Sequence, residues 1–146
     1  MTLNIDQAVC NSFKSQLLDG NHDFSAAGGN TFKLALYTSA ATLNATTTVY
    51  TSTNEVVATG TYVAGGGVLA GQTVSLDGSV GIVDFADLSF TGVTLSALGA
   101  VIYNTSFGSN AAVCVLDFGA VKTATSGTFT ILFPAFTSAA AILRIA

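Results

Sequence analysis

The amino-acid sequence predicts an all-β protein, a jelly-roll-like antiparallel β-sandwich preceded by one N-terminal α-helix. Two observations support this fold class. After residue 30 the chain consists of short β-prone segments separated by Gly, Asn, Asp and Ser, at the spacing typical of sandwiches and barrels. Before residue 20 apolar residues recur every four positions among polar ones, which is a helical pattern. The 146 residues fit a single domain over 1–146, with the helix over 1–20 and the sandwich over 32–146.

The N-terminal helix is expected over Leu3–Asp19. Its apolar residues recur from Ile5 to Leu17 with Asn, Asp, Gln and Lys between them, so one face is apolar and the other polar. Gly20 is expected to end the helix as a left-handed cap, and Asn21–Asn30 then forms a loop. We expect the apolar face to dock on the sandwich; the alternative is that the helix reaches a neighbouring subunit.

Eight strands are expected after the loop. They are predicted over Phe32–Thr38, Gln72–Leu76, Val80–Phe85, Leu88–Leu95, Leu98–Asn104, Val113–Phe118, Gly127–Phe133 and Ala140–Ile145. The pair Asp77–Gly78 favours a type I′ hairpin, and Pro134 ends the strand before it. Between the first two strands, Ala40–Gly71 is expected to be a long excursion with short strands around Val49–Thr51 and Thr59–Val63.

Two of these strands are apolar on both faces, whereas an antiparallel strand normally shows one face to water. Along Leu98–Asn104 and Val113–Phe118 almost every side chain is apolar, unlike Gly127–Phe133, which alternates Phe and Ile with Thr. The two-faced strands therefore need a second covering layer. The other sheet, the N-terminal helix or a neighbouring subunit would supply it.

Charged residues are rare. They make up 8% of the chain, against about 25% in an ordinary soluble domain. Because ionised side chains mostly coat protein surfaces, this surface must consist largely of Thr, Ser, Gly, Asn and apolar groups. Such a surface has weak protection against association, so we expect other protein chains to cover much of it. The composition predicts a homo-oligomer.

Nucleic acid and membranes are not expected as partners. The net charge is −4, and the four basic residues are scattered over Lys14, Lys33, Lys122 and Arg144. Apolar runs such as Ala111–Leu116 are far shorter than the ~20 residues of a membrane helix. No secretory signal is expected at the N-terminus either.

The chain offers few residues for catalysis, with one His and a single Glu. His22 stands near Asp23 and Ser25, but a Ser-His-Asp triad is assembled from separated segments, and no G-x-S-x-G elbow is present. A loop histidine without a catalytic role is the stronger interpretation. The sequence thus predicts that the protein is not an enzyme and has no catalytic residues.

Metal and cofactor sites are not expected. Asp77, Asp84 and Asp87 form the densest acidic group but lack the spacing of a calcium loop, so turns and strand ends explain them better. Gly65–Gly67 has no following Lys-Ser/Thr, so a flexible or close-packed loop is favoured over a phosphate loop. No cofactor and no metal are predicted.

The tyrosines and cysteines also favour structural roles. Tyr37, Tyr50, Tyr62 and Tyr103 are spread across the predicted strands, so they are interpreted as core and interface aromatics rather than as a ligand-binding face. Cys10 and Cys114 show no metal-ligand spacing, and without a secretory signal both are interpreted as buried small apolar residues. A disulfide between them is the alternative.

Five segments of the sequence resemble a known class of proteins. They are VDFADLSF at Val83–Phe90, GAVIYN at Gly99–Asn104, FKLALYT at Phe32–Thr38, VLDFG at Val115–Gly119 and GTFTI at Gly127–Ile131. In this order the chain resembles small structural proteins encoded by tailed bacteriophages. None of the segments is a catalytic signature, so the resemblance rests on their joint order.

The resemblance implies a virion component. The expected role is a head decoration, or cement, protein with a jelly-roll-like sandwich, a homotrimer seated on the major capsid protein at the capsid exterior and made in the cytoplasm of the bacterial host. The alternative within the same class is a tail, tail-fibre or receptor-binding structural module.

Overall fold

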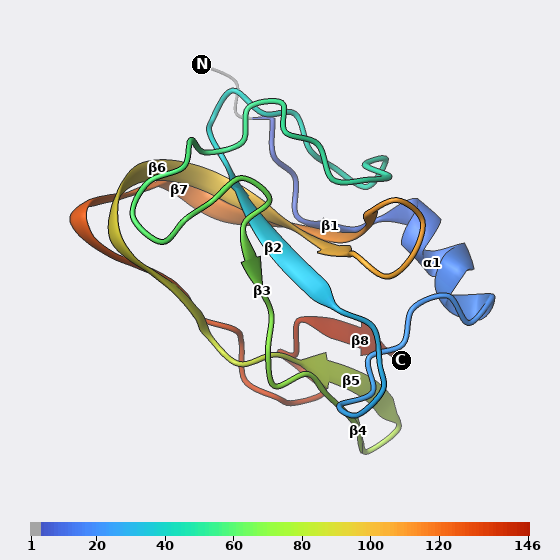
Figure 1. Cartoon of the computed structure of the whole chain (residues 1–146). Coiled ribbons are helices and arrows are strands. Elements are labelled where there is room, and N and C mark those ends of the chain that lie inside the picture. Colours follow the sequence, from blue (N-terminus) through green and yellow to red (C-terminus); the bar gives the residue numbers. More distant parts are fainter. Residues whose placement is uncertain (1–3) are drawn as a thin grey trace.

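The computed structural model describes residues 4–146, which form two antiparallel sheets and one short helix (Figure 1). The elements are β1 (Ala8–Val9), α1 (Asn11–Leu18), β2 (Phe32–Tyr37), β3 (Gly67–Val68), β4 (Thr73–Asp77), β5 (Val80–Asp84), β6 (Leu88–Asn104), β7 (Ala111–Ile131) and β8 (Leu143–Ile145). One sheet has the order β1-β7-β6-β2-β3 and the other the order β4-β5-β8. The prediction of an all-β sandwich preceded by a helix is confirmed.

The N-terminal helix is shorter than predicted. It begins at Asn11, because Ala8 and Val9 instead pair with β7 as strand β1; the expected start at Leu3 lies outside the described residues. A spacing of four residues fits a strand, whose period is two, as well as it fits a helix. The predicted cap at Gly20 is confirmed, since its φ is +78° and its N–H donates to the Leu17 carbonyl.

Strands β6 and β7 form one long hairpin that crosses the whole molecule (Figure 1). Four of the predicted strands merge in it, two into β6 and two into β7. The ladder continues through the expected break, where the hydroxyls of Ser96 and Thr123 lie 2.9 Å apart. Gly92 and Gly119 adopt positive φ of +62° and +80° near shifts in register. Both glycines therefore make bulges inside long strands, and Gly119, which follows a predicted strand, does not end it.

The chain itself covers both faces of the central strands. The core cluster joins Leu98 and Val115 of the hairpin with Phe13 of α1 and with Val56 and Tyr62 of the middle excursion. Phe13 is 4% exposed, so the expected docking of the helix on the sandwich is confirmed. The two-faced strands need no neighbouring subunit to bury them.

An aromatic cluster fills the region between the two sheets. Phe24 stacks on Phe32 of β2, with ring centroids 4.4 Å apart. Phe85, which follows β5, lies 5.9 Å from Phe32 and 5.7 Å from Phe133, which follows β7. Rings at these separations gain from edge and stacking contacts as well as from burial. Segments adjoining both sheets therefore share one core.

The short strands predicted in the middle excursion are absent from the described residues. Val49 makes only an isolated bridge to Ala111, and Thr59 and Tyr62 exchange two hydrogen bonds across a tight turn. Gly60 allows that turn with a φ of +51°. The Thr-rich composition suggested strand, but turn geometry and long-range contacts decide the conformation here.

The β4–β5 hairpin lies at the predicted position but has a different turn. Asp77 pairs with Val80, so Gly78 and Ser79 are the central residues. Only Gly78 has a positive φ, +63°, whereas a type I′ turn needs two such residues. The turn has the pattern of type II′.

Gly65 and Gly66 form a close-packed loop rather than a flexible one, and Gly67 begins strand β3. Gly66 has a φ of +81°, and a Cβ atom there would lie 1.8 Å from the carbonyl oxygen of Leu34 in β2. Both the backbone conformation and the contact exclude any larger residue. This approach brings the end of the excursion onto the central sheet.

Replacing Gly66 with Ala is expected to lower the free energy of unfolding by about 2–5 kcal/mol, from ~1–2 kcal/mol of left-handed strain plus ~1–3 kcal/mol of overpacking. Gly28→Ala is the matched control, because Gly28 has a φ of +77° but no atom within 4 Å of the place that a Cβ atom would take. Urea unfolding of both variants measures the difference. Equal losses would contradict the close approach.

Candidate functional site

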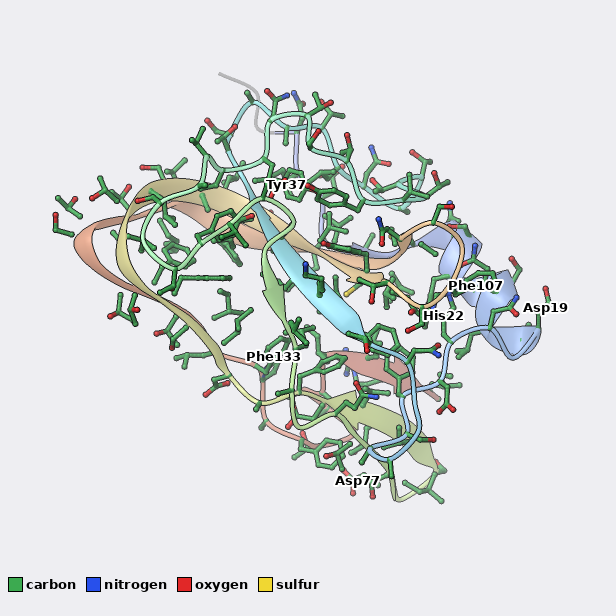
Figure 2. The ribbon with its side chains drawn as sticks, in the orientation of Figure 1. Asp19, His22, Tyr37, Asp77, Phe107 and Phe133 are labelled. Atoms are coloured by element: carbon green, nitrogen blue, oxygen red, sulfur yellow. The ribbon has the colours of Figure 1, made fainter. Side chains whose placement is uncertain are left out.

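His22 is buried, and both of its ring nitrogens have hydrogen-bond partners inside the fold. Its ring, 5% exposed, packs on Phe13 and Phe107 with centroids 4.7 and 5.5 Å away (Figure 2). The side-chain amide of Asn104 donates to Nδ1 at 3.0 Å, so Nε2 carries the proton and donates to Gln16 Oε1 at 2.8 Å. Burial lowers the pKa of His22 below its ordinary value of 6.5. The imidazole is therefore held neutral.

Asp23 and Ser25 do not complete a catalytic triad. The Ser25 N–H donates to Asp23 Oδ1 at 2.9 Å, and the Asp23 N–H donates to Asn30 Oδ1 at 2.9 Å. Hydrogen bonds from Ser25 lower the pKa of the exposed Asp23 carboxyl. Both nitrogens of His22 already have amide partners, so no carboxylate orients the ring.

Asp77 and Asp87 each accept a separate backbone hydrogen bond, whereas the buried Oδ1 of Asp84 has no hydrogen-bond partner among the described residues. Asp77 and Asp84 lie at opposite ends of the β4–β5 hairpin, and Figure 2 places Asp77 at the edge of the molecule. Asp77 Oδ2 accepts the Ser138 N–H at 2.6 Å, and Asp87 Oδ1 accepts the Phe133 N–H at 2.8 Å. Within residues 4–146, no three His, Cys, Asp or Glu side chains gather in a group able to hold a metal ion.

The chain's single glutamate is the centre of a hydrogen-bonded cluster that the sequence did not reveal. The Glu55 carboxylate accepts the Tyr50 hydroxyl, the Tyr62 hydroxyl at 2.8 Å and the Gly65 N–H at 2.7 Å. Tyr103 stacks on Tyr50 and donates its hydroxyl to the Gly65 carbonyl at 2.5 Å. The sequence could have drawn attention to Glu55, because it is the chain's only glutamate, but its hydrogen-bond partners are known only from the fold.

The tyrosines of this cluster are structural. Tyr37, Tyr62 and Tyr103 are buried, as predicted for core aromatics, and Tyr37 donates to the Thr51 carbonyl at 2.6 Å. Burial is the main cause that raises the pKa of Tyr103 to about 12, with the Glu55 charge second, and burial raises the pKa of the other tyrosines further. The four phenols therefore stay protonated at neutral pH, as hydrogen-bond donors.

The two cysteines are free and buried, which confirms their interpretation as small apolar residues. Burial raises the pKa of the Cys10 thiol to about 11 and raises the pKa of Cys114 still more. Because the thiolate is the reactive form, both thiols are poor nucleophiles at neutral pH.

An apolar groove separates α1 from the three-stranded sheet and is the candidate interaction site. We call it the α1 groove; its volume is about 760 Å³. The helix and the sheet lie on the same side of the molecule (Figure 1). The groove is lined mainly by Phe13, Leu17 and Leu18 from the helix side and by Val74, Leu143 and Ile145 from the sheet side. Lys14 and Arg144, two of the chain's four basic residues, also line it.

The sheet side of the α1 groove is an apolar face that is buried at Leu143 and exposed toward the edge strand β4. Strand pairing places Val74 beside Val83 and Leu143, and Leu76 beside Gly81 and Ile145, on one face. Large side chains on and beside it are well exposed: Leu18 by 89%, Leu76 by 69%, Ile145 by 63% and Val74 by 56%. This face was not predicted from the sequence.

Stability between pH 5 and 7.5 is expected to depend on His22. In the unfolded chain the imidazole regains its ordinary pKa, so the unfolded state binds more protons and the free energy of unfolding falls as the pH drops below about 6.5. His22 is the only histidine. Urea unfolding should therefore show this loss in the natural protein and a nearly flat profile in His22→Gln. An equal slope in the variant would contradict a buried neutral imidazole.

Comparison with known proteins adds no relative. No family model, curated protein or solved structure matches this chain. No helix in residues 4–146 is long and apolar enough to cross a bilayer. The α1 groove and the exposed residues of β4 and β8 beside it are the surface features that bear on function.

Proposed function

We propose that this chain is a structural protein of a bacteriophage virion, a head decoration or cement protein that acts through protein contacts. The observation that carries the proposal is the apolar α1 groove, which opens on the surface of a chain with only 8% charged residues. Apolar patches of this kind, bordered by polar residues, mark sites of protein interaction. The placement in a virion comes from the resemblance of the five sequence segments.

The use of the titratable groups supports a structural role over an enzymatic one. The Glu55 carboxylate and the His22 imidazole have their hydrogen bonds inside the fold. Asp77 and Asp87 hold neighbouring backbone segments. A catalytic acid or base needs free access to a substrate proton, which the buried His22 ring, bonded at both nitrogens, lacks.

The proposed mechanism is stabilisation of the capsid by mass action. A protein that binds only the assembled shell favours that state by an amount set by its concentration relative to its dissociation constant. The α1 groove would receive an apolar segment of the major capsid protein at the capsid exterior. A homotrimer would present three grooves at once, which strengthens overall binding without any new contact.

Binding to capsids is expected to depend on the α1 groove. Leu18→Glu should weaken binding to purified phage heads at least tenfold, because it places a charge in the apolar contact. Val57→Glu is the matched control, since Val57 is 82% exposed and outside the groove. The measurement is co-sedimentation of each variant with purified heads, with isolated tails and with host-envelope polysaccharide, which distinguishes a head protein from a tail or receptor-binding module. Binding to tails or polysaccharide alone would favour a tail or receptor-binding module and overturn the proposal.

Self-association is expected to give a trimer. Light scattering on the purified protein at micromolar concentration should give a mass three times the 14.7 kDa of one chain. Trimer closure would also conceal sheet edges that otherwise attract other strands. A mass of one chain throughout this range would contradict the expected oligomer.

A further inference from the structure

We infer that β4 pairs edge to edge with β4 of a second copy of this chain, in antiparallel orientation around a two-fold axis. The strand is at the edge of the β4-β5-β8 sheet, and all five of its residues are exposed. An exposed edge strand presents unpaired N–H and C=O groups that can pair with another strand. The pairing itself can be tested whether or not the proposed virion role holds, whereas the crowding of copies that favours it rests on that role.

The hairpin fixes which main-chain groups of β4 are free. Asp77 and Val80 close the two-residue turn as a hydrogen-bonded pair, so Ser75 and Thr73 also bond across to β5. The N–H and C=O groups of Val74 and Leu76 then point away from the sheet. Among the described residues, no partner outside the hairpin bonds to these groups.

The sequence of β4 is complementary to itself in one register. When Ser75 stands opposite Ser75 of the second copy, each Val74 faces Leu76 of the other chain and each Asp77 faces Thr73. The free groups of Val74 and Leu76 then exchange hydrogen bonds, and their apolar side chains pack across the junction. No two like charges meet. The join would extend the apolar sheet face of one α1 groove into that of the next.

The other edge strands are poorer candidates. Edges β1 and β3 have two residues each, and β8 has three, including Arg144. By contrast β4 has five residues and contains no Pro, Lys or Arg, the residues with which proteins usually block an edge. Among the strands at the ends of the two sheets, β4 is therefore the longest and carries none of these residues. The outer edge of β7 is longer, since β1 covers it only at Cys114 and Val115, but it contains Lys122 and several shifts in register.

The contact is weak and suits copies that are already held close together. Two five-residue edges bury less than the ~1,200 Å² typical of a stable complex. Linked or lattice-bound copies reach effective concentrations in the millimolar range, at which such a contact is populated. Because a two-fold contact joins copies in pairs, it would link trimers rather than close one.

Disulfide trapping with Ser75→Cys tests the register. In the inferred pairing the two residues 75 form a non-hydrogen-bonded pair with Cα atoms ~4.5 Å apart, within disulfide range. Thr73→Cys is the matched control, because it lies on the same exposed strand face but four residues (~13 Å) from its own copy in the partner. Cys10 and Cys114 are buried and do not compete.

Mild oxidation should form Ser75→Cys dimers at least tenfold faster than Thr73→Cys dimers on non-reducing gels. Adding Leu76→Lys to Ser75→Cys should slow trapping at least tenfold, because two lysines would then flank the junction. Leu132→Lys, at a residue 75% exposed and outside β4, should leave the rate unchanged. Equal trapping of the two cysteine variants, or no effect of Leu76→Lys, would overturn the inference. Both results are independent of whether the protein binds phage heads.

Discussion

The conformation of the middle excursion depends on one requirement: the edge of β2 that faces away from β6 must find hydrogen-bond partners. This strand is buried and pairs along its whole length with β6, whereas on its other side only Lys33 and Leu34 pair with β3. Buried main-chain groups that lack partners cost about as much as a lost hydrogen bond. The middle excursion supplies the missing partners. The Leu36 N–H donates to the Tyr62 hydroxyl at 2.8 Å, and the Leu36 carbonyl accepts the Val56 N–H at 2.9 Å.

Glu55 explains how an excursion with little regular structure completes the sheet. Its carboxylate fixes Tyr62, which reaches β2, and Gly65, which leads into the close approach of Gly66 to Leu34. Hydrogen bonds to an ionised acceptor are roughly twice as strong as neutral ones. By holding these two residues, Glu55 keeps the excursion on β2 where a continuous strand would have formed a regular hydrogen-bond ladder. Glu55 is only half-buried, so its carboxylate remains in contact with water.

Local patterns in the sequence predicted the features that depend on neighbours along the chain. The fold class, the cap at Gly20, the position of the β4–β5 hairpin and the burial of both cysteines belong to this group. The features that were missed depend on tertiary contacts. Gly119 became a bulge because a long partner strand supports it, and the Glu55 cluster brings Tyr103 to Gly65, 38 positions away in the chain. The α1 groove is the space between α1 and the β4-β5-β8 sheet, which are distant in sequence.

The connection between β6 and β7 is anchored at its tip by Phe107, whose ring packs on His22 beside α1. A foreign peptide grafted into that tip would therefore displace the imidazole and disturb the helix. The loop at Ala26–Gly28 is different, since these residues are exposed and nothing crowds Gly28. Exposed loop tips accept insertions best. For display of epitopes or enzymes on the molecule, the loop after the helix is the permissive position, although the tip of the longest hairpin projects more obviously.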